Sequence, residues 1–214
     1  MYGEIFAAVL SQLQRDVAAT QARADSVMAV AAAQGLVHRI GHGRLLRGWV
    51  LAMRGDAVES VAQIRQGLAA TEGTGLKLFR PYFLALLAEA CGQAGQPEAG
   101  LTTLAEALAL VAATEERWWE AEVYRLQGAL LLQLPRPDVG QSEACFQQAL
   151  EVAHHQQAKA LELRAALSLA RLWQGQGKQA AVRQLLTESS SWFTEGFDTA
   201  DLQEARVLLE ESGF

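Results

Sequence analysis

Apolar residues recur every three or four positions along almost the whole chain, which is the spacing of one face of an α-helix. Glycine and proline interrupt this pattern, and both are typical of helix ends. Runs of valine, isoleucine or threonine, which would indicate strands, are few. The pattern therefore predicts an all-α chain. We expect helices at residues 2–14, 16–34, 38–53, 57–72, 80–94, 97–113, 116–133, 139–156, 158–174, 178–190 and 199–211.

Four small residues in these helices reveal a repeat, because they occupy equivalent places at separations of 40, 40 and 42 residues. They are Gly48, Ala88, Gly128 and Ala170. A glycine inside a helix costs about 1 kcal/mol relative to alanine, so it needs a structural reason. We expect each small residue to let a facing helix approach closely, beside a large apolar residue that fills the space. The expected large residues are Ile64, Leu104, Phe146 and Leu186.

A turn separates the two helices of each repeat. Gly55, Gly95 and Gly177 each follow one of the small residues by seven positions and precede a second helical segment. A glycine just past the last helical residue is typical of a helix C-terminal cap. In the third repeat the stretch "PRPDVG" (135–140) predicts a longer turn. Each repeat is therefore expected to be a helical hairpin.

The small and large positions of these hairpins resemble the tetratricopeptide repeat, most closely in residues 84–107 and next in 124–149. The period of about 40 residues exceeds the usual 34, which implies longer helices. The resemblance implies an α–α superhelix, or solenoid, of about five hairpins with a C-terminal capping helix, in a single domain covering 1–214. The expected repeats are 1–35, 36–75, 76–115, 116–157 and 158–191, with the cap at 192–214.

Three longer stretches resemble a more specific group of proteins. They are "RPYFLALLAEACGQAGQPEAGLTTLAEALALV" (80–111), "WWEAEVYRLQGALLLQ" (118–133) and "WFTEGFDTADLQEARVLLEE" (192–211). They look like the C-terminal repeat region of bacterial signalling proteins, which join a class III nucleotide cyclase or a DNA-binding domain to an AAA-type ATPase. The resemblance implies a non-enzymatic interaction or sensor module that serves as the regulatory arm of such an ATPase or cyclase.

Composition narrows the possible functions. The net charge of −6 is spread along the chain without a basic stripe, so nucleic acid is not expected as a partner. No apolar run is long enough to span a bilayer and the N-terminus lacks the basic region of a signal peptide, so we expect a cytoplasmic protein without membrane contact. Cys91 and Cys145 lie far apart in apolar segments, and no phosphate-binding glycine motif occurs. We therefore expect no catalytic residues, no cofactor and no metal.

The expected binding site is the concave groove, which the first helix of each hairpin lines in a tetratricopeptide superhelix. Trp49 and Tyr82 would anchor a peptide or protein partner, and Arg125, Arg164 and Arg171 would contact its carboxylates. The alternative is that both aromatic residues pack between repeats and the arginines form a solvated face. The predicted groove comprises His42, Trp49, Met53, Tyr82, Glu89, Gln93, Glu122, Arg125, Gln133, Arg164, Arg171 and Gln174.

Two other functions remain open from the sequence. The first is a small-molecule sensor or an enzyme site inside the superhelix, which predicts a closed pocket and carboxylates with shifted pKa values. Its residues would be Trp49, Tyr82, Glu89, Glu122 and Arg125. The second is self-association as a homodimer through the apolar face of the N-terminal helix. That face would present Ile5, Phe6 and Leu10.

Overall fold

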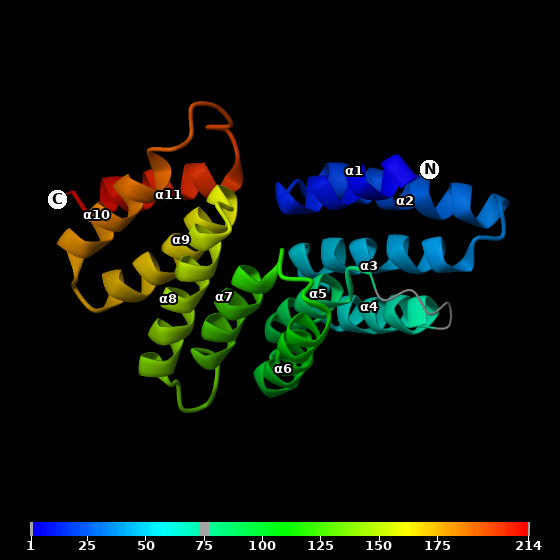
Figure 1. Ribbon diagram of the computed structural model, residues 1–214, viewed down its shortest axis with the longest axis horizontal. Coiled ribbons are helices and arrows are strands. Elements are labelled where there is room, and N and C mark those ends of the chain that lie inside the picture. The colour runs from blue at the N-terminus through cyan, green and yellow to red at the C-terminus, as the bar shows by residue number, and fades with distance from the viewer. Residues whose placement is uncertain (1, 73–77, 214) are drawn as a thin grey trace. The chain divides into compact units, whose positions relative to one another are not determined.

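The computed structural model describes residues 2–72 and 78–213, and this part of the chain is helical without strands (Figure 1). The prediction of an all-α chain is confirmed. No helix among the described residues is both long and apolar enough to cross a membrane. The eleven described helices are α1 (Tyr2–Leu13), α2 (Val17–Ala33), α3 (Val37–Met53), α4 (Ala57–Glu72), α5 (Arg80–Gln93), α6 (Pro97–Thr114), α7 (Glu120–Leu131), α8 (Val139–His155), α9 (Lys159–Gly175), α10 (Gln179–Ser190) and α11 (Ala200–Glu211).

The predicted helix ends agree with the structure to within two residues, except at the start of α7. That helix was expected from residue 116 but begins at Glu120. Glu115 adopts a left-handed conformation with φ 57°, and the Arg117 amide donates to the Glu115 carbonyl at 3.0 Å, so the chain turns before the helix starts. The following Trp119 is 3% exposed. The burial of Trp119 sets the residue at which α7 begins. The helix propensity of the neighbouring residues does not predict this position.

Six of the turns between helices share one backbone geometry. In each turn one residue after the helix end has a positive φ. The backbone amide of the residue that follows it donates to the carbonyl five positions earlier, as the amide of Asp56 does to the carbonyl of Leu51 at 3.0 Å. This is the Schellman arrangement, which satisfies carbonyl groups at the helix end. The predicted C-terminal glycines are confirmed. The residues with a positive φ in these six turns are Arg15, Gly35, Gly55, Gly95, Gln157 and Gly177.

The two glycines among the small residues of the repeat lie at close helix contacts, as predicted. A Cβ atom built on Gly48 would lie 2.4 Å from Cγ1 of Ile64, and one built on Gly128 would lie 2.6 Å from Cε1 of Phe146. Both distances are shorter than real carbon contacts allow. The absence of a side chain therefore permits α3 to approach α4, and α7 to approach α8.

The chain divides into two compact units, which are described separately. Unit 1 covers residues 1–114 and contains α1 to α6; each helix packs on the next, and α3 also packs on α1 and α5. Unit 2 covers residues 115–214 and contains α7 to α11; each helix again packs on the next, and α9 also packs on α7 and α11. The single domain expected from the sequence stays a prediction.

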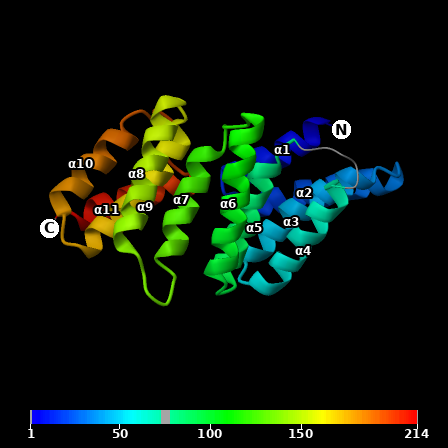
Figure 2. The same ribbon diagram turned by 60° about the horizontal axis from the view of Figure 1, so that its bottom comes forward.

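The odd-numbered helices of each unit therefore contact one another: α3 contacts α1 and α5, and α9 contacts α7 and α11. Figures 1 and 2 show α7, α8 and α9 side by side. The core of unit 2 is built around α9, whose Leu163 and Leu167 are at most 2% exposed. Apolar residues of α10 and α11 cover it, namely Val182, Leu186, Leu202, Ala205 and Leu208.

Candidate functional site

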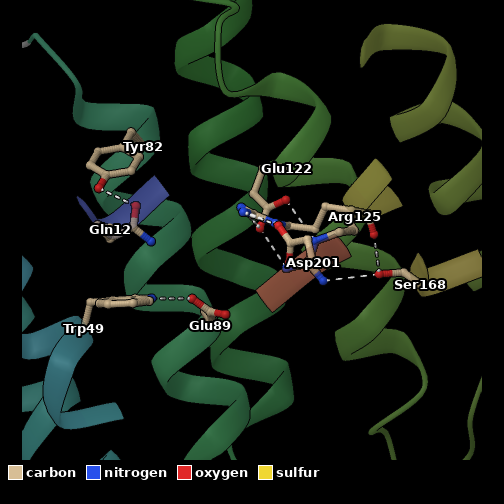
Figure 3. Close-up of polar contacts among 9 residues, drawn as sticks. Gln12, Trp49, Tyr82, Glu89, Glu122, Arg125, Ser168 and Asp201 are labelled. Carbon is tan, nitrogen blue, oxygen red and sulfur yellow. Dashed lines mark hydrogen bonds and ion pairs between the residues drawn. The ribbon is translucent and has the colours of Figure 1, made fainter. Parts of the chain in front are cut away.

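The predicted anchors of the groove in unit 1 are core residues. Trp49 is 2% exposed, and its indole Nε1 donates to Oε2 of Glu89 at 3.2 Å (Figure 3). Tyr82 has no exposed surface, and its hydroxyl donates to Oε1 of Gln12 in α1 at 2.7 Å. Both aromatic side chains thus pack between helices, as the alternative interpretation expected. In this conformation neither is available as an anchor for a partner.

The other predicted groove residues of unit 1 are divided between core and surface. His42 is buried against Phe83, with ring centroids 5.4 Å apart. Met53 and Glu89 are half-buried, and Gln93 is exposed. The predicted inward face of α3 therefore contributes mainly to the core of unit 1.

In unit 2, three charged residues predicted for the groove, Glu122, Arg125 and Arg164, form a buried cluster with Asp201, which was not predicted. Arg125 donates to Glu122 through two hydrogen bonds, from Nη2 to Oε1 at 2.7 Å and from Nε to Oε2 at 2.9 Å. Arg164 lies 2.8 Å from Oδ2 of Asp201 through Nη2, and 3.8 Å from Oε1 of Glu122 through Nη1. These residues, which we call the charge cluster, connect α7, α9 and α11 (Figure 3).

Opposite charges in the charge cluster keep Glu122 and Arg164 ionised. Burial by itself would raise the pKa of Glu122, but the positive charges of Arg125 and Arg164 outweigh it and lower that pKa below its ordinary value. Burial would also lower the pKa of Arg164, but Glu122 and Asp201 raise it. Glu122 is therefore a carboxylate at neutral pH and accepts hydrogen bonds, which suits an ion pair and not a proton donor.

The lowered pKa of Glu122 predicts a loss of stability in acid. The unfolded chain, whose glutamate has the ordinary pKa, takes up a proton before the folded chain does, so unfolding becomes easier as the pH falls. The contribution is complete above the ordinary pKa of about 4.3 and is lost as the pH falls through the lower folded-state value.

Urea unfolding of the natural chain and of Glu122→Gln across this acidic range measures the effect. We expect the difference in their free energies of unfolding to shrink with falling pH. A difference that stays constant would show that Glu122 does not titrate with a lowered pKa.

Beside the charge cluster, α7, α8 and α9 border a hollow of about 480 Å³. We call it the α7–α9 hollow. Its residues from α9 are spaced as one face of that helix, and those from α7 are spaced likewise. The lining residues are Arg125, Ala129, Leu132, Val139, Phe146, Ser168, Arg171, Leu172, Gly175 and Gln176.

The α7–α9 hollow combines apolar walls with cationic and polar groups. Phe146 is 1% exposed and Leu172 is half-buried, whereas Val139 at the rim is 43% exposed. Arg125 and Arg171 supply guanidinium groups, and none of the lining residues is acidic. The volume lies within the range of about 300 to 1,000 Å³ that is typical of ligand pockets.

Only some of the residues predicted for the groove line this hollow. Arg125 and Arg171 do, while Glu122 and Arg164 are buried in the charge cluster. Gln133 is exposed outside the lining, and Gln174 donates from Nε2 to Oε2 of Glu211 at 2.9 Å. The groove as a continuous surface stays a prediction.

The sequence analysis missed Ser168, Leu172 and Gln176. Ser168 and Leu172 each lie one position after a residue of the predicted inward face of α9, and Gln176 lies two positions after Gln174. Arg164 on that face contacts Asp201 of α11. The spacing of the three missed residues with Arg171 was visible in the sequence as a helix face, but the choice between neighbouring faces depends on where α11 packs.

The apolar face predicted for self-association is only partly exposed. Phe6 and Leu10 are 51% and 55% exposed, but Ile5 is 8% exposed and therefore packs inside unit 1. It lines a smaller hollow of about 270 Å³, together with Glu4, Val27, Val30, Gln34 and Arg39. A homodimer through Phe6 and Leu10 stays a prediction.

Comparisons with known proteins add no assignment to these sites: neither the scan against protein-family models nor the search of curated proteins found a match to the chain. Cys91 and Cys145 are free and buried, and burial raises the pKa of each thiol, so both remain protonated at neutral pH. Within the described residues, no group of three or more histidine, cysteine or acidic side chains is placed to hold a metal ion.

Proposed function

We propose that the chain is a non-enzymatic interaction module, a tetratricopeptide-like helical repeat that binds a peptide segment of a partner protein in the α7–α9 hollow. The observation that carries the proposal is the hollow itself, with its apolar walls, its two guanidinium groups and its volume of about 480 Å³. Small-molecule sensing within the repeat is the competing function.

The packing of the helices supports the repeat part of the proposal. Each helix contacts the next along the chain within its unit, and alternate helices contact one another through α3 in unit 1 and α9 in unit 2. Stacked helical hairpins of a solenoid make such nearest-neighbour contacts. The close approaches at Gly48 and Gly128 lie two repeat periods apart along the chain.

Exposure at the rim favours a peptide segment over a small molecule. Val139, Gly175 and Gln176 line the hollow and are exposed, so a side chain of a partner can enter from the surface without displacing a helix. The walls would then hold an apolar side chain, and the polar groups would fix the backbone that carries it. A bacterial signalling ATPase or cyclase as the parent protein, in the cytoplasm, rests on the sequence resemblance alone.

A selection from a displayed library of random peptides tests the proposal. The matched variants are Ala129→Leu, which fills the hollow, and Ala144→Leu, which adds the same atoms at an exposed position of α8 outside it. We expect selected peptides to bind the natural chain and Ala144→Leu equally, and Ala129→Leu at least about tenfold more weakly, since about 1.4 kcal/mol of lost contact suffices.

Two outcomes would contradict the proposal. One is a selection that enriches no specific binder. The other is a set of peptides whose affinities for Ala129→Leu and Ala144→Leu are the same, because binding would then occur outside the hollow.

A further inference from the structure

We infer that the segment bound in the α7–α9 hollow is acidic as well as apolar: one carboxylate contacts Arg171, and a neighbouring apolar side chain packs against Phe146 and Leu172. This inference rests on the proposed function and specifies the chemistry of its partner. It follows from how charge is distributed between the lining of the hollow and the residues next to it.

The lining of the hollow contains positive groups without negative ones. Arg125 and Arg171 line it, whereas their partners Glu122 and Glu204 contact the two arginines from outside the lining. The carboxylates therefore orient the guanidinium groups without occupying the hollow. Side chains held in place before binding lose less conformational entropy when the ligand arrives. An anionic group entering the hollow meets hydrogen-bond donors and no like charge among the lining residues.

Arg171 is the better placed of the two arginines. Arg125 already contacts Glu122 through Nε and Nη2, and its Nη1 lies 3.4 Å from the hydroxyl of Ser168. Arg171 contacts Glu204 through Nη2, and its side chain is 53% exposed. A guanidinium has five N–H donors, so Arg171 can donate hydrogen bonds to a second carboxylate while it stays paired with Glu204.

The apolar walls select the rest of the segment. Phe146 closes the hollow from α8, and Ala129 and Leu172 border it from α7 and α9. Removing apolar surface from water stabilises the complex in proportion to the buried area. Ser168 lies one helical turn before Leu172, on the same face of α9 as Arg171. A carboxylate at Arg171 and an apolar side chain at Leu172 must therefore come from positions close together in the bound segment.

A double-mutant cycle on one selected peptide tests the inference. Fluorescence anisotropy measures the Kd of the peptide and of its amide variant, in which the acidic residue becomes Asn or Gln, for the natural chain and for Arg171→Gln. We expect each single change to weaken binding about tenfold, the size of one charge-assisted contact, and both together to weaken it no further than one alone. The matched control is Arg206→Gln, which removes an exposed arginine from another ion pair in α11 and should leave Kd unchanged.

The outcomes separate this inference from the proposed function. Peptides that bind in the hollow, shown by their sensitivity to Ala129→Leu, but that lack acidic residues or tolerate Arg171→Gln would overturn the inference and leave the proposed function standing. A failure of every peptide to respond to Ala129→Leu would overturn both. Hexanoate, a free carboxylate with an apolar chain, is the small-molecule probe; binding as tight as that of the peptide would overturn the peptide as occupant.

Discussion

Glu122→Gln should lower the free energy of unfolding of unit 2 by about 3 kcal/mol, since breaking a buried ion pair leaves uncompensated charge in the interior. The change keeps the shape of the side chain, so little of the loss comes from a cavity. Arg125 loses both hydrogen bonds to a carboxylate, and Arg164 keeps Asp201 as its charged partner. Native-state hydrogen exchange of the α9 amides would measure this loss separately from unit 1.

The matched control for this prediction is Glu210→Gln. Glu210 pairs with Arg206 on the surface of α11, and both side chains are more than half exposed, at 62% and 74%. Such pairs contribute about 0 to 1 kcal/mol. Equal effects of the two substitutions would show that the charge cluster does not hold α7 and α9 together.

The second large effect is expected at Gly128. Gly128→Ala places a Cβ atom 2.6 Å from Cε1 of Phe146 and 2.9 Å from the carbonyl oxygen of Ser142. Alanine favours a helix over glycine by about 1 kcal/mol, but crowding in a close-packed core costs about 1–3 kcal/mol, and here a backbone atom must also move. We expect a net destabilisation of about 2 kcal/mol in urea unfolding.

Gly175→Ala serves as the control at the end of α9, since a Cβ atom there meets nothing within 4 Å. It should be neutral or slightly stabilising. Phe146→Leu in the same chain as Gly128→Ala should recover part of the loss by relieving the contact with the aromatic ring. If Gly128→Ala instead stabilises the chain, the close approach of α7 to α8 is not part of the native structure.

The helices could be predicted from the sequence because their ends are marked locally. Gly55, Gly95 and Gly177 stand where a left-handed conformation ends a helix, and Pro135 and Pro137 separate α7 from α8. The start of α7 could not be predicted, because Glu115 adopts the same left-handed conformation without being glycine. Tertiary contacts around Trp119 decide that turn.

The binding surface was harder to predict than the helices. Helical periodicity indicates which residues share a face, but the direction of that face depends on the helices packed beside it. In unit 1, Tyr82 contacts Gln12 of α1, seventy residues earlier, and this contact covers a side chain that was expected to face a partner. In unit 2, Arg164 contacts Asp201 of α11, and the hollow is lined by residues further along α9, beginning with Ser168.

Charged residues in unit 2 thus have two roles in our account, which Arg125 combines and Arg171 does not. Glu122, Arg125, Arg164 and Asp201 connect three helices through buried contacts, and Arg171 remains at the surface beside apolar walls. Substitutions in the charge cluster should change stability, whereas Arg171→Gln should change binding with little effect on folding. This separation makes the binding proposal testable without destabilising the chain.

The most direct test of the central claim is a map of amide chemical shifts in the ¹⁵N-labelled chain on titration with a selected peptide. We predict that the largest changes occur at residues of α7 and α9 that line the hollow, including Ala129, Ser168 and Leu172. Changes confined to unit 1, or to faces of unit 2 away from these residues, would contradict the assignment of the α7–α9 hollow as the binding site.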